Sequence, residues 1–208
     1  MVFQKAKKIN IGAVALDPIA RDDLLYALDA LVASGGFHAI VFCEAHLCVQ
    51  ATRNAEVAHA LAAATIVLPD GVAMTAGARF LGDRFPSRLP GPLVMLDYCR
   101  HGATLGRRHF FYGGAPGTPE RLMEKLTTEI PGLKVVGTYS PPYRSLSATE
   151  EQNVKVRIEE SGADVLWVGL GAPKQELWMA SHLGRIRVPL MLGVGAAFDF
   201  HSGTRAWA

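Results

Sequence analysis

The sequence predicts an α/β fold, a mostly parallel Rossmann-like sheet with helices on both faces. Three observations predict it. Short apolar runs alternate with segments of helical spacing along most of the chain. Two late apolar runs end in Gly-x-Gly turns, Gly169 to Gly171 and Gly193 to Gly195. Polar or charged residues follow each strand, as they do at the carboxyl edge of a parallel sheet, where ligands bind. We therefore expect one shared site at that edge.

The predicted strands are the short apolar runs bounded by turn residues. They comprise residues 9–15, 37–43, 65–68, 109–112, 134–138, 165–168 and 190–192. Their alternation with helices indicates parallel pairing, because parallel strands need a crossover that is usually helical.

The predicted helices lie between these strands. Asp17 and Pro18 open the first, Leu24, Leu28 and Leu31 give it helical spacing, and the glycines at 35 and 36 end it. Further helices are expected over residues 46–64 (alanine-rich) and 72–81, from the proline-rich loop at 85–92 to about 104, from Pro119, over 149–161, and from Lys174.

The composition indicates a single globular domain over residues 1–208. Half of the residues are hydrophobic, 19% are charged and the net charge is +2, which excludes a disordered chain and gives no case for nucleic acid. No apolar run approaches the roughly 20 residues that cross a bilayer, and no signal peptide is recognisable. We expect a cytoplasmic protein, and association with a membrane surface stays open.

The three cysteines, Cys43, Cys48 and Cys99, predict reduced thiols rather than disulfides, since their number is odd and no CxxC occurs. A metal site built from Cys43, His46 and Cys48 is the alternative. Their spacing matches no common zinc pattern, so no metal site is predicted.

Two carboxylates follow predicted strands, Glu44 after the second and Asp70 after the third. Asp70 has two interpretations. It either caps the N-terminus of the helix that follows, or acts as a general base that takes a proton from an attacking hydroxyl.

Glycines and a helix start provide candidate anion contacts. The sequence Gly113-Gly114-x-x-Gly117 is either a phosphate cradle or a plain tight turn. Lys174, followed by Gln175 and Glu176, opens a helix, where a cation opposes the helix dipole. That mismatch suggests an anionic ligand or a partner carboxylate, and the alternative is an ordinary exposed first turn.

Asp199 lies between Phe198 and Phe200. In an extended segment the two rings would share one face and the carboxylate would take the other, as a ligand contact or a buried structural group. Arg79, Arg84 and Arg88 surround the proline-rich loop. They form a solvated face, and Arg88 is the best placed of them to hold a diphosphate.

Several signatures are absent from the sequence. It contains no GxGxxG, no GxxxxGK[ST], no GxSxG and no Asp-x-Asp. The first absence disfavours a nicotinamide-dependent oxidoreductase, which is one rival function. The last means that a bound nucleotide diphosphate would be neutralised by amides and basic side chains.

Five ordered motifs resemble those of the WecG/TagA/CpsF family of glycosyltransferases (glycosyltransferase family 26), from about residue 9 to the last. They are Pro69-Asp70-Gly71, Arg88-Leu89-Pro90-Gly91, Phe110-Phe111-Tyr112-Gly113-Gly114, Gly169-x-Gly171-x-Pro173-Lys174-Gln175-Glu176-x-Trp178 and Gly193-Val194-Gly195-x-x-Phe198-Asp199-Phe200-x-x-Gly203.

The resemblance implies an inverting, metal-independent enzyme without a cofactor. It would move an N-acetylmannosamine-type sugar from a UDP-sugar to a polyprenyl-diphosphate-linked acceptor, in the synthesis of cell-surface polysaccharides. Asp70 would be the base, Arg88 and Gln175 would line the cleft, and Asp199 would lie near the nucleotide-sugar. A non-catalytic nucleotide-sugar sensor or scaffold is the second rival function.

The sequence departs from the family pattern in two places. Phe42-Cys43-Glu44 stands where the family often has Thr-x-Asn, and similar sequences occur in an exopolysaccharide-type branch. Glu44 would share the acid–base work, change the donor specificity or be structural. The family's basic, aromatic C-terminal appendage does not follow Ala208, so we expect weak donor binding, little activity and a homo-oligomer at the inner face of the plasma membrane.

Overall fold

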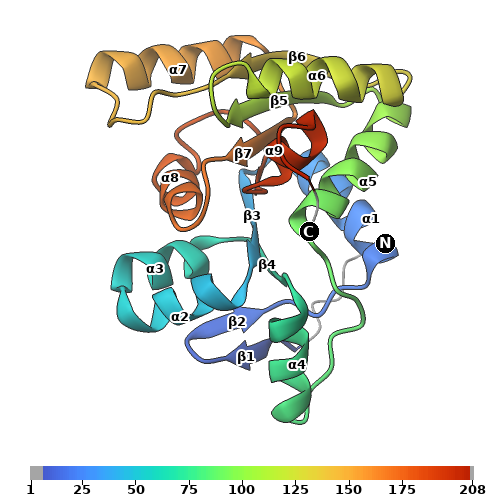
Figure 1. The fold of residues 1–208 in the computed structure, drawn as a ribbon, viewed down its shortest axis with the longest axis vertical. Coiled ribbons are helices and arrows are strands. Elements are labelled where there is room, and N and C mark those ends of the chain that lie inside the picture. Colours follow the sequence, from blue (N-terminus) through green and yellow to red (C-terminus); the bar gives the residue numbers. More distant parts are fainter. Residues whose placement is uncertain (1–6, 207–208) are drawn as a thin grey trace.

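The computed structural model describes residues 7–206, and its centre is a parallel sheet (Figure 1). Within these residues the sheet has six strands in the order β4-β3-β8-β7-β5-β6. All five neighbouring pairs are parallel. The strands are β3 (His38–Cys43), β4 (Ile66–Pro69), β5 (Arg108–Gly113), β6 (Lys134–Tyr139), β7 (Val165–Gly169) and β8 (Leu190–Gly193). The predicted α/β class is confirmed.

Helices cover both faces of this sheet, as predicted. Successive strand residues point to opposite faces, so Ile40 and Phe42 enter one core cluster while Val41 and Cys43 enter the other. The first cluster is completed by α1 (Arg21–Ala33), α5 (Gly91–Thr104), α6 (Thr118–Glu129) and α9 (Ala197–Ser202). The second is completed by α2 (Ala45–Arg53), α3 (Ala55–Ala63), α4 (Val72–Phe80), α7 (Ala148–Glu160) and α8 (Lys174–His182).

The prediction of one extended run over residues 9–15 was wrong. These residues belong to a small antiparallel hairpin, β1 (Ile9–Ile11) and β2 (Val14–Leu16), separate from the main sheet. The register pairs Ile11 with Val14, which leaves a two-residue turn. Gly12 in that turn has a φ of 57°, a conformation that glycine adopts without steric cost.

The prediction of one helix over residues 46–64 was also wrong, because the chain breaks between α2 and α3 at Asn54. This residue is extended, with φ −132° and ψ 111°. Its side-chain oxygen accepts hydrogen bonds from the amides of Glu56 at 2.9 Å and Val57 at 3.4 Å. A good N-cap residue thus starts a second helix inside an alanine-rich segment.

The sheet brings distant parts of the chain to its carboxyl edge. The ends of β3 and β4 lead into Glu44 and Asp70, and β7 and β8 lead into the two Gly-x-Gly turns.

Among residues 7–206, no helix has both the length and the apolar character that crossing a bilayer requires.

We predict that Asn54→Ala lowers the free energy of unfolding by about 1 kcal/mol, because the first-turn amides of α3 lose their acceptor. Urea denaturation measures the change. Asn153→Ala is the matched control, since Asn153 is exposed within α7 and alanine has the higher helix propensity there. Equal stability of wild type and Asn54→Ala would contradict the assignment of the cap.

Candidate functional site

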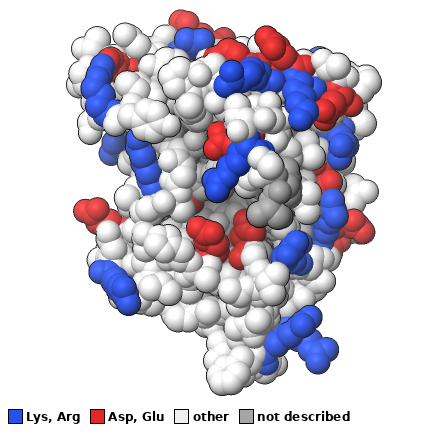
Figure 2. Space-filling model, in the orientation of Figure 1, with Lys and Arg blue, Asp and Glu red and all other residues white. Residues whose placement is uncertain are grey.

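Two adjoining hollows lie at the carboxyl edge of the sheet in the described part of the chain. The first, here called the glycine hollow, has a volume of about 260 Å³, and the second, the acidic hollow, about 380 Å³. Both are lined by Gly171, Gly195 and Ala196, which form the ridge between them. Red carboxylate side chains gather near the hollowed centre of the face shown in Figure 2. At the edge where the sequence predicts one shared site, the structure has two neighbouring compartments.

The acidic hollow contains both candidate catalytic carboxylates, Asp70 and Glu44. Asp70 is half-buried, and its Oδ2 accepts a hydrogen bond from the amide of Gly91 at 3.3 Å. Burial raises the pKa of Asp70, and the charge of Glu44 raises it further, while the Gly91 amide and Arg88 oppose this. Asp70 is therefore a stronger base than an exposed aspartate and still faces an open space.

The expectation that Asp70 caps the helix after it needs a correction. The N-cap residue of α4 is Gly71, and no side-chain hydrogen bond caps that helix. Asp70 instead accepts from Gly91, the first residue of α5. Its carboxylate thus stabilises the N-terminus of a different helix and ties the loop before α5 to the end of β4.

Glu44 and Arg88, the other two candidate residues near Asp70, differ in their positions. Glu44 is exposed, is the N-cap residue of α2 without a side-chain capping hydrogen bond, and lines the acidic hollow. Arg88 is exposed and belongs to the lining of neither hollow, although its charge acts on Asp70. The structure therefore brings Glu44 into the site and leaves Arg88 at its margin.

The glycine hollow is where the predicted anion contacts converge. Lys174, at the N-terminus of α8, and Asp199 both line it, together with Gly114 and Gly169. Gly171 has a φ of 77°, and a Cβ added there would meet nothing within 4 Å, so the role of this glycine is conformational. The small residues here leave room for an anion close to the backbone. The basic side chain and the helix N-terminus favour its negative charge.

Gly113 has a structural role instead. A Cβ at this position would lie 2.4 Å from the carbonyl oxygen of Gly169, and Gly113 is not part of the hollow's lining. A Cβ on Gly169 would lie 2.9 Å from the ring of Phe198. These glycines allow β5, β7 and α9 to approach closely, and Gly114, one residue on, is the one that reaches the hollow.

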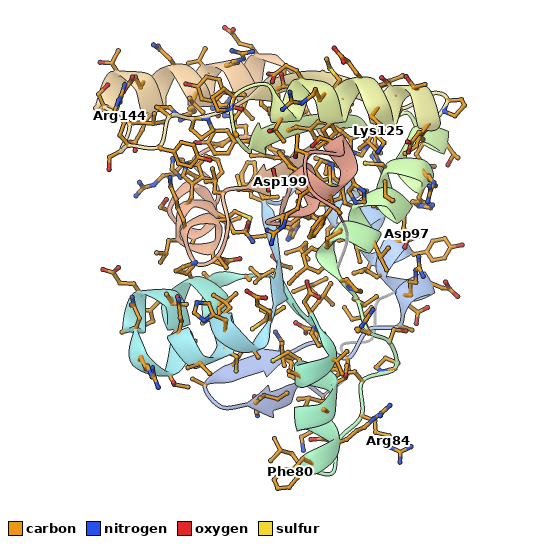
Figure 3. All side chains as sticks on the ribbon, in the orientation of Figure 1. Phe80, Arg84, Asp97, Lys125, Arg144 and Asp199 are labelled. Carbon is orange, nitrogen blue, oxygen red and sulfur yellow. The ribbon has the colours of Figure 1, made fainter. Side chains whose placement is uncertain are left out.

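The expectation of an extended segment around Asp199 was wrong, because residues 198–200 lie within α9. Phe198 is 1% exposed and packs edge-on against Phe111 with ring centroids 5.8 Å apart. Phe198 lines neither hollow, and its ring packs on the buried side of Gly169. Asp199 lines the glycine hollow and Phe200 the acidic hollow, since helical spacing turns neighbours in different directions. Figure 3 shows Asp199 at the start of this helix.

Gln175 and Glu176 connect the two Gly-x-Gly turns from within. The Oε1 atom of Gln175 accepts from the amide of Gly195 at 3.0 Å, and its Nε2 atom donates to Oε1 of Glu176 at 2.8 Å. Glu176 is 1% exposed, and its Oε2 atom is buried without a hydrogen-bond partner. Burial raises the pKa of Glu176 to about 7. Glu176 is thus a buried support for Gln175 and not an open substrate contact.

Residues that the sequence did not propose as site residues complete the lining. Pro141, Pro142 and Tyr143 form part of the glycine hollow, and Phe42, Pro92, Val194 and Phe200 part of the acidic one. The available signal for the first group was its place directly after a strand, at the same edge as the other candidates.

Within residues 7–206, no three histidine, cysteine or acidic side chains converge as a metal site.

The family model described as "Glycosyl transferase WecG/TagA/CpsF family" matches residues 9–208 of this chain. The match covers every element of the sheet and both hollows. It therefore concerns the fold and the site together and not one isolated motif.

Curated relatives of this chain include three N-acetylglucosaminyldiphosphoundecaprenol N-acetyl-beta-D-mannosaminyltransferases. That of Bacillus spizizenii is 26% identical over 164 residues, 79% of this chain and 62% of the relative. That of Bacillus subtilis is 27% identical over 69% of this chain and 54% of the relative. That of Staphylococcus aureus is 27% identical over 68% and 54%. The aligned region thus spans little more than half the length of each relative.

We predict that Glu176→Gln removes part of the pH dependence of stability. The pKa of Glu176 is raised in the folded state. The contribution of this residue to the free energy of unfolding is therefore fully present below its unfolded pKa of about 4.5, and it is lost as the pH rises to about 7. The loss amounts to about 3 kcal/mol. Glutamine keeps an acceptor for Gln175 and does not titrate. Urea denaturation at pH 5 and pH 8 should show a smaller loss in the variant, and parallel losses in both proteins would refute this assignment.

Proposed function

Because the chain belongs to the WecG/TagA/CpsF family of glycosyltransferases, we propose that it transfers N-acetylmannosamine or a related sugar from a UDP-sugar to a polyprenyl-diphosphate-linked acceptor. The names of its relatives give this sugar and an undecaprenyl-diphosphate acceptor for those proteins. The product would enter the synthesis of a cell-surface polysaccharide.

The observation that carries this proposal is the environment of Asp70. A half-buried carboxylate with a raised pKa lines the acidic hollow, beside a second compartment suited to an anion. In the proposed reaction Asp70 takes the proton from the acceptor hydroxyl as that oxygen attacks the anomeric carbon of the donor. A single displacement of this kind inverts the anomeric centre. Glu44 holds a negative charge beside Asp70, and this charge favours protonation of the Asp70 carboxylate.

The donor diphosphate would occupy the glycine hollow. The N-terminus of α8 and the ammonium of Lys174 would offset the negative charge that builds on the departing UDP, together with backbone amides beside Gly114. Asp199 would accept hydrogen bonds from sugar hydroxyls. Since the sequence contains no Asp-x-Asp pair, these groups and not a divalent metal would neutralise the diphosphate in our proposal.

We predict that Asp70→Asn lowers kcat by roughly 10²–10⁴-fold, because the amide cannot take the proton. The assay measures sugar transfer from UDP-N-acetylmannosamine to a polyprenyl-diphosphate-linked N-acetylglucosamine. Asp23→Asn is the matched control, since Asp23 is exposed in the first turn of α1, away from both hollows. Undiminished turnover, or loss of the folded state by circular dichroism, would count against a base and for a purely structural Asp70.

We predict that Lys174→Ala weakens UDP binding about tenfold, which corresponds to about 1.4 kcal/mol for a lost charged contact. Isothermal titration calorimetry measures the affinity. Lys134→Ala is the control, since Lys134 is an exposed lysine at the start of β6, at the opposite edge of the sheet. Equal weakening by both substitutions would indicate a general charge effect and not a contact in the glycine hollow. UDP binding by a chain without turnover would favour the sensor or scaffold role.

A further inference from the structure

Helix α4 presents an apolar end to solvent. Of its nine residues only Met74 and Ala78 are buried. The ring of Phe80 is 92% exposed, and the side chain of Leu81, which follows the helix, is 57% exposed. Figure 3 shows Phe80 projecting from the end of α4, away from the rest of the molecule. Two adjacent large apolar side chains at such a protruding point are typical of a surface that contacts a protein or a membrane.

Arginines surround this apolar end. Arg79 and Arg84 are both exposed, and Asp83 is the acidic residue between them in sequence. Figure 3 shows Arg84 extending outward at the same end of the molecule as Phe80, and Figure 2 shows a white protrusion with blue side chains next to it. Apolar side chains that enter a bilayer interface, flanked by cations that meet anionic head groups, are the combination found in interfacial helices.

The charges also bear on which partner fits. If two copies of the chain paired through this point by a two-fold axis, the interface would gather Arg79 and Arg84 from both copies, with Asp83 as the acidic residue of each tip. Like charges placed opposite each other are unfavourable. An anionic bilayer offers acyl chains for Phe80 and Leu81 and phosphates for the arginines.

The position of α4 links this surface to the site. The helix starts at Val72, two residues after Asp70 in the acidic hollow, and its nine residues span about 14 Å. Contact of its end with a bilayer would therefore hold Asp70 about one short helix away from the surface in which a lipid-linked acceptor is anchored.

We propose that the α4 tip, defined as Arg79, Phe80, Leu81 and Arg84, docks on an anionic lipid bilayer and places the acidic hollow beside the membrane. This inference rests on the proposed function for its purpose, since a lipid-linked acceptor needs such a contact. Its physical basis, the exposed apolar end with its arginines, is independent of catalysis.

Sedimentation with vesicles tests the docking. The chain should bind vesicles of phosphatidylglycerol and phosphatidylcholine, and bind vesicles of phosphatidylcholine alone more weakly. The double substitution Phe80→Ser and Leu81→Ser should weaken binding at least tenfold, because burial of these two side chains is lost. Arg79→Glu with Arg84→Glu should remove the preference for the anionic vesicles.

Two control substitutions match these changes elsewhere on the surface. Leu105 is 52% exposed after α5, and Arg121 is exposed in the first turn of α6, so Leu105→Ser and Arg121→Glu should leave vesicle binding within about twofold of wild type. All four substituted tip side chains are exposed, so the fold should persist, and circular dichroism checks this.

Three results would overturn the docking: no binding of the wild-type chain to anionic vesicles, unchanged binding of the tip variants, or loss of self-association in sedimentation velocity without any change in vesicle binding. The last would assign the tip to a second copy of the chain. Asp70→Asn should bind vesicles like wild type, and the tip variants should keep turnover on a short, water-soluble acceptor. Failure of docking is therefore distinguishable from failure of the proposed function.

Discussion

The hydrogen bonds of the Gln175 side chain hold the site together. Its amide joins the start of α8 to the amide of Gly195 beyond β8, and so it fixes the distance between the two Gly-x-Gly turns. Because Gly171 and Gly195 line both hollows, this side chain, together with the backbone hydrogen bond from Val194 to Val168, supports the shape of each compartment. Glu176, buried behind it, holds the other end of the amide and restricts its rotation.

Close backbone packing is the second constraint on the same region. A Cβ on Gly193 would lie 2.8 Å from Cε of Met179 and 3.1 Å from Nε2 of Gln175. The absence of a side chain at Gly193 therefore lets α8 lie against the end of β8, within reach of the Gly195 amide. Gly113 and Gly169 do the same for β5, β7 and α9. Several glycines that suggest ligand contact in the sequence are thus required for the sheet edge to assemble.

The sequence predicted the main sheet well, because its strands are buried on both faces and show as apolar runs between turn residues. It did not predict the break at Asn54, where local capping overrides a continuous alanine-rich pattern, or the turn at Gly12. For the candidate site, strand-end position predicted that Asp70 and Glu44 lie at one edge, since parallel strands share an edge. The buried place of Phe198 and the part of Pro141 in the lining depend on how distant segments pack, which periodicity does not encode.

The distribution of charge argues for a division of work between the compartments. Glu44 and Asp70 line the acidic hollow, and Glu176 lies close enough for the charge of Glu44 to act on its pKa. A pyrophosphate placed among these carboxylates would meet like charge at short range, in surroundings less polar than water. The glycine hollow instead offers Lys174 and a helix N-terminus. In the proposed reaction, therefore, the nucleotide belongs on the Lys174 side of the ridge, the neutral acceptor hydroxyl on the Asp70 side, and the anomeric carbon between them beside Gly171.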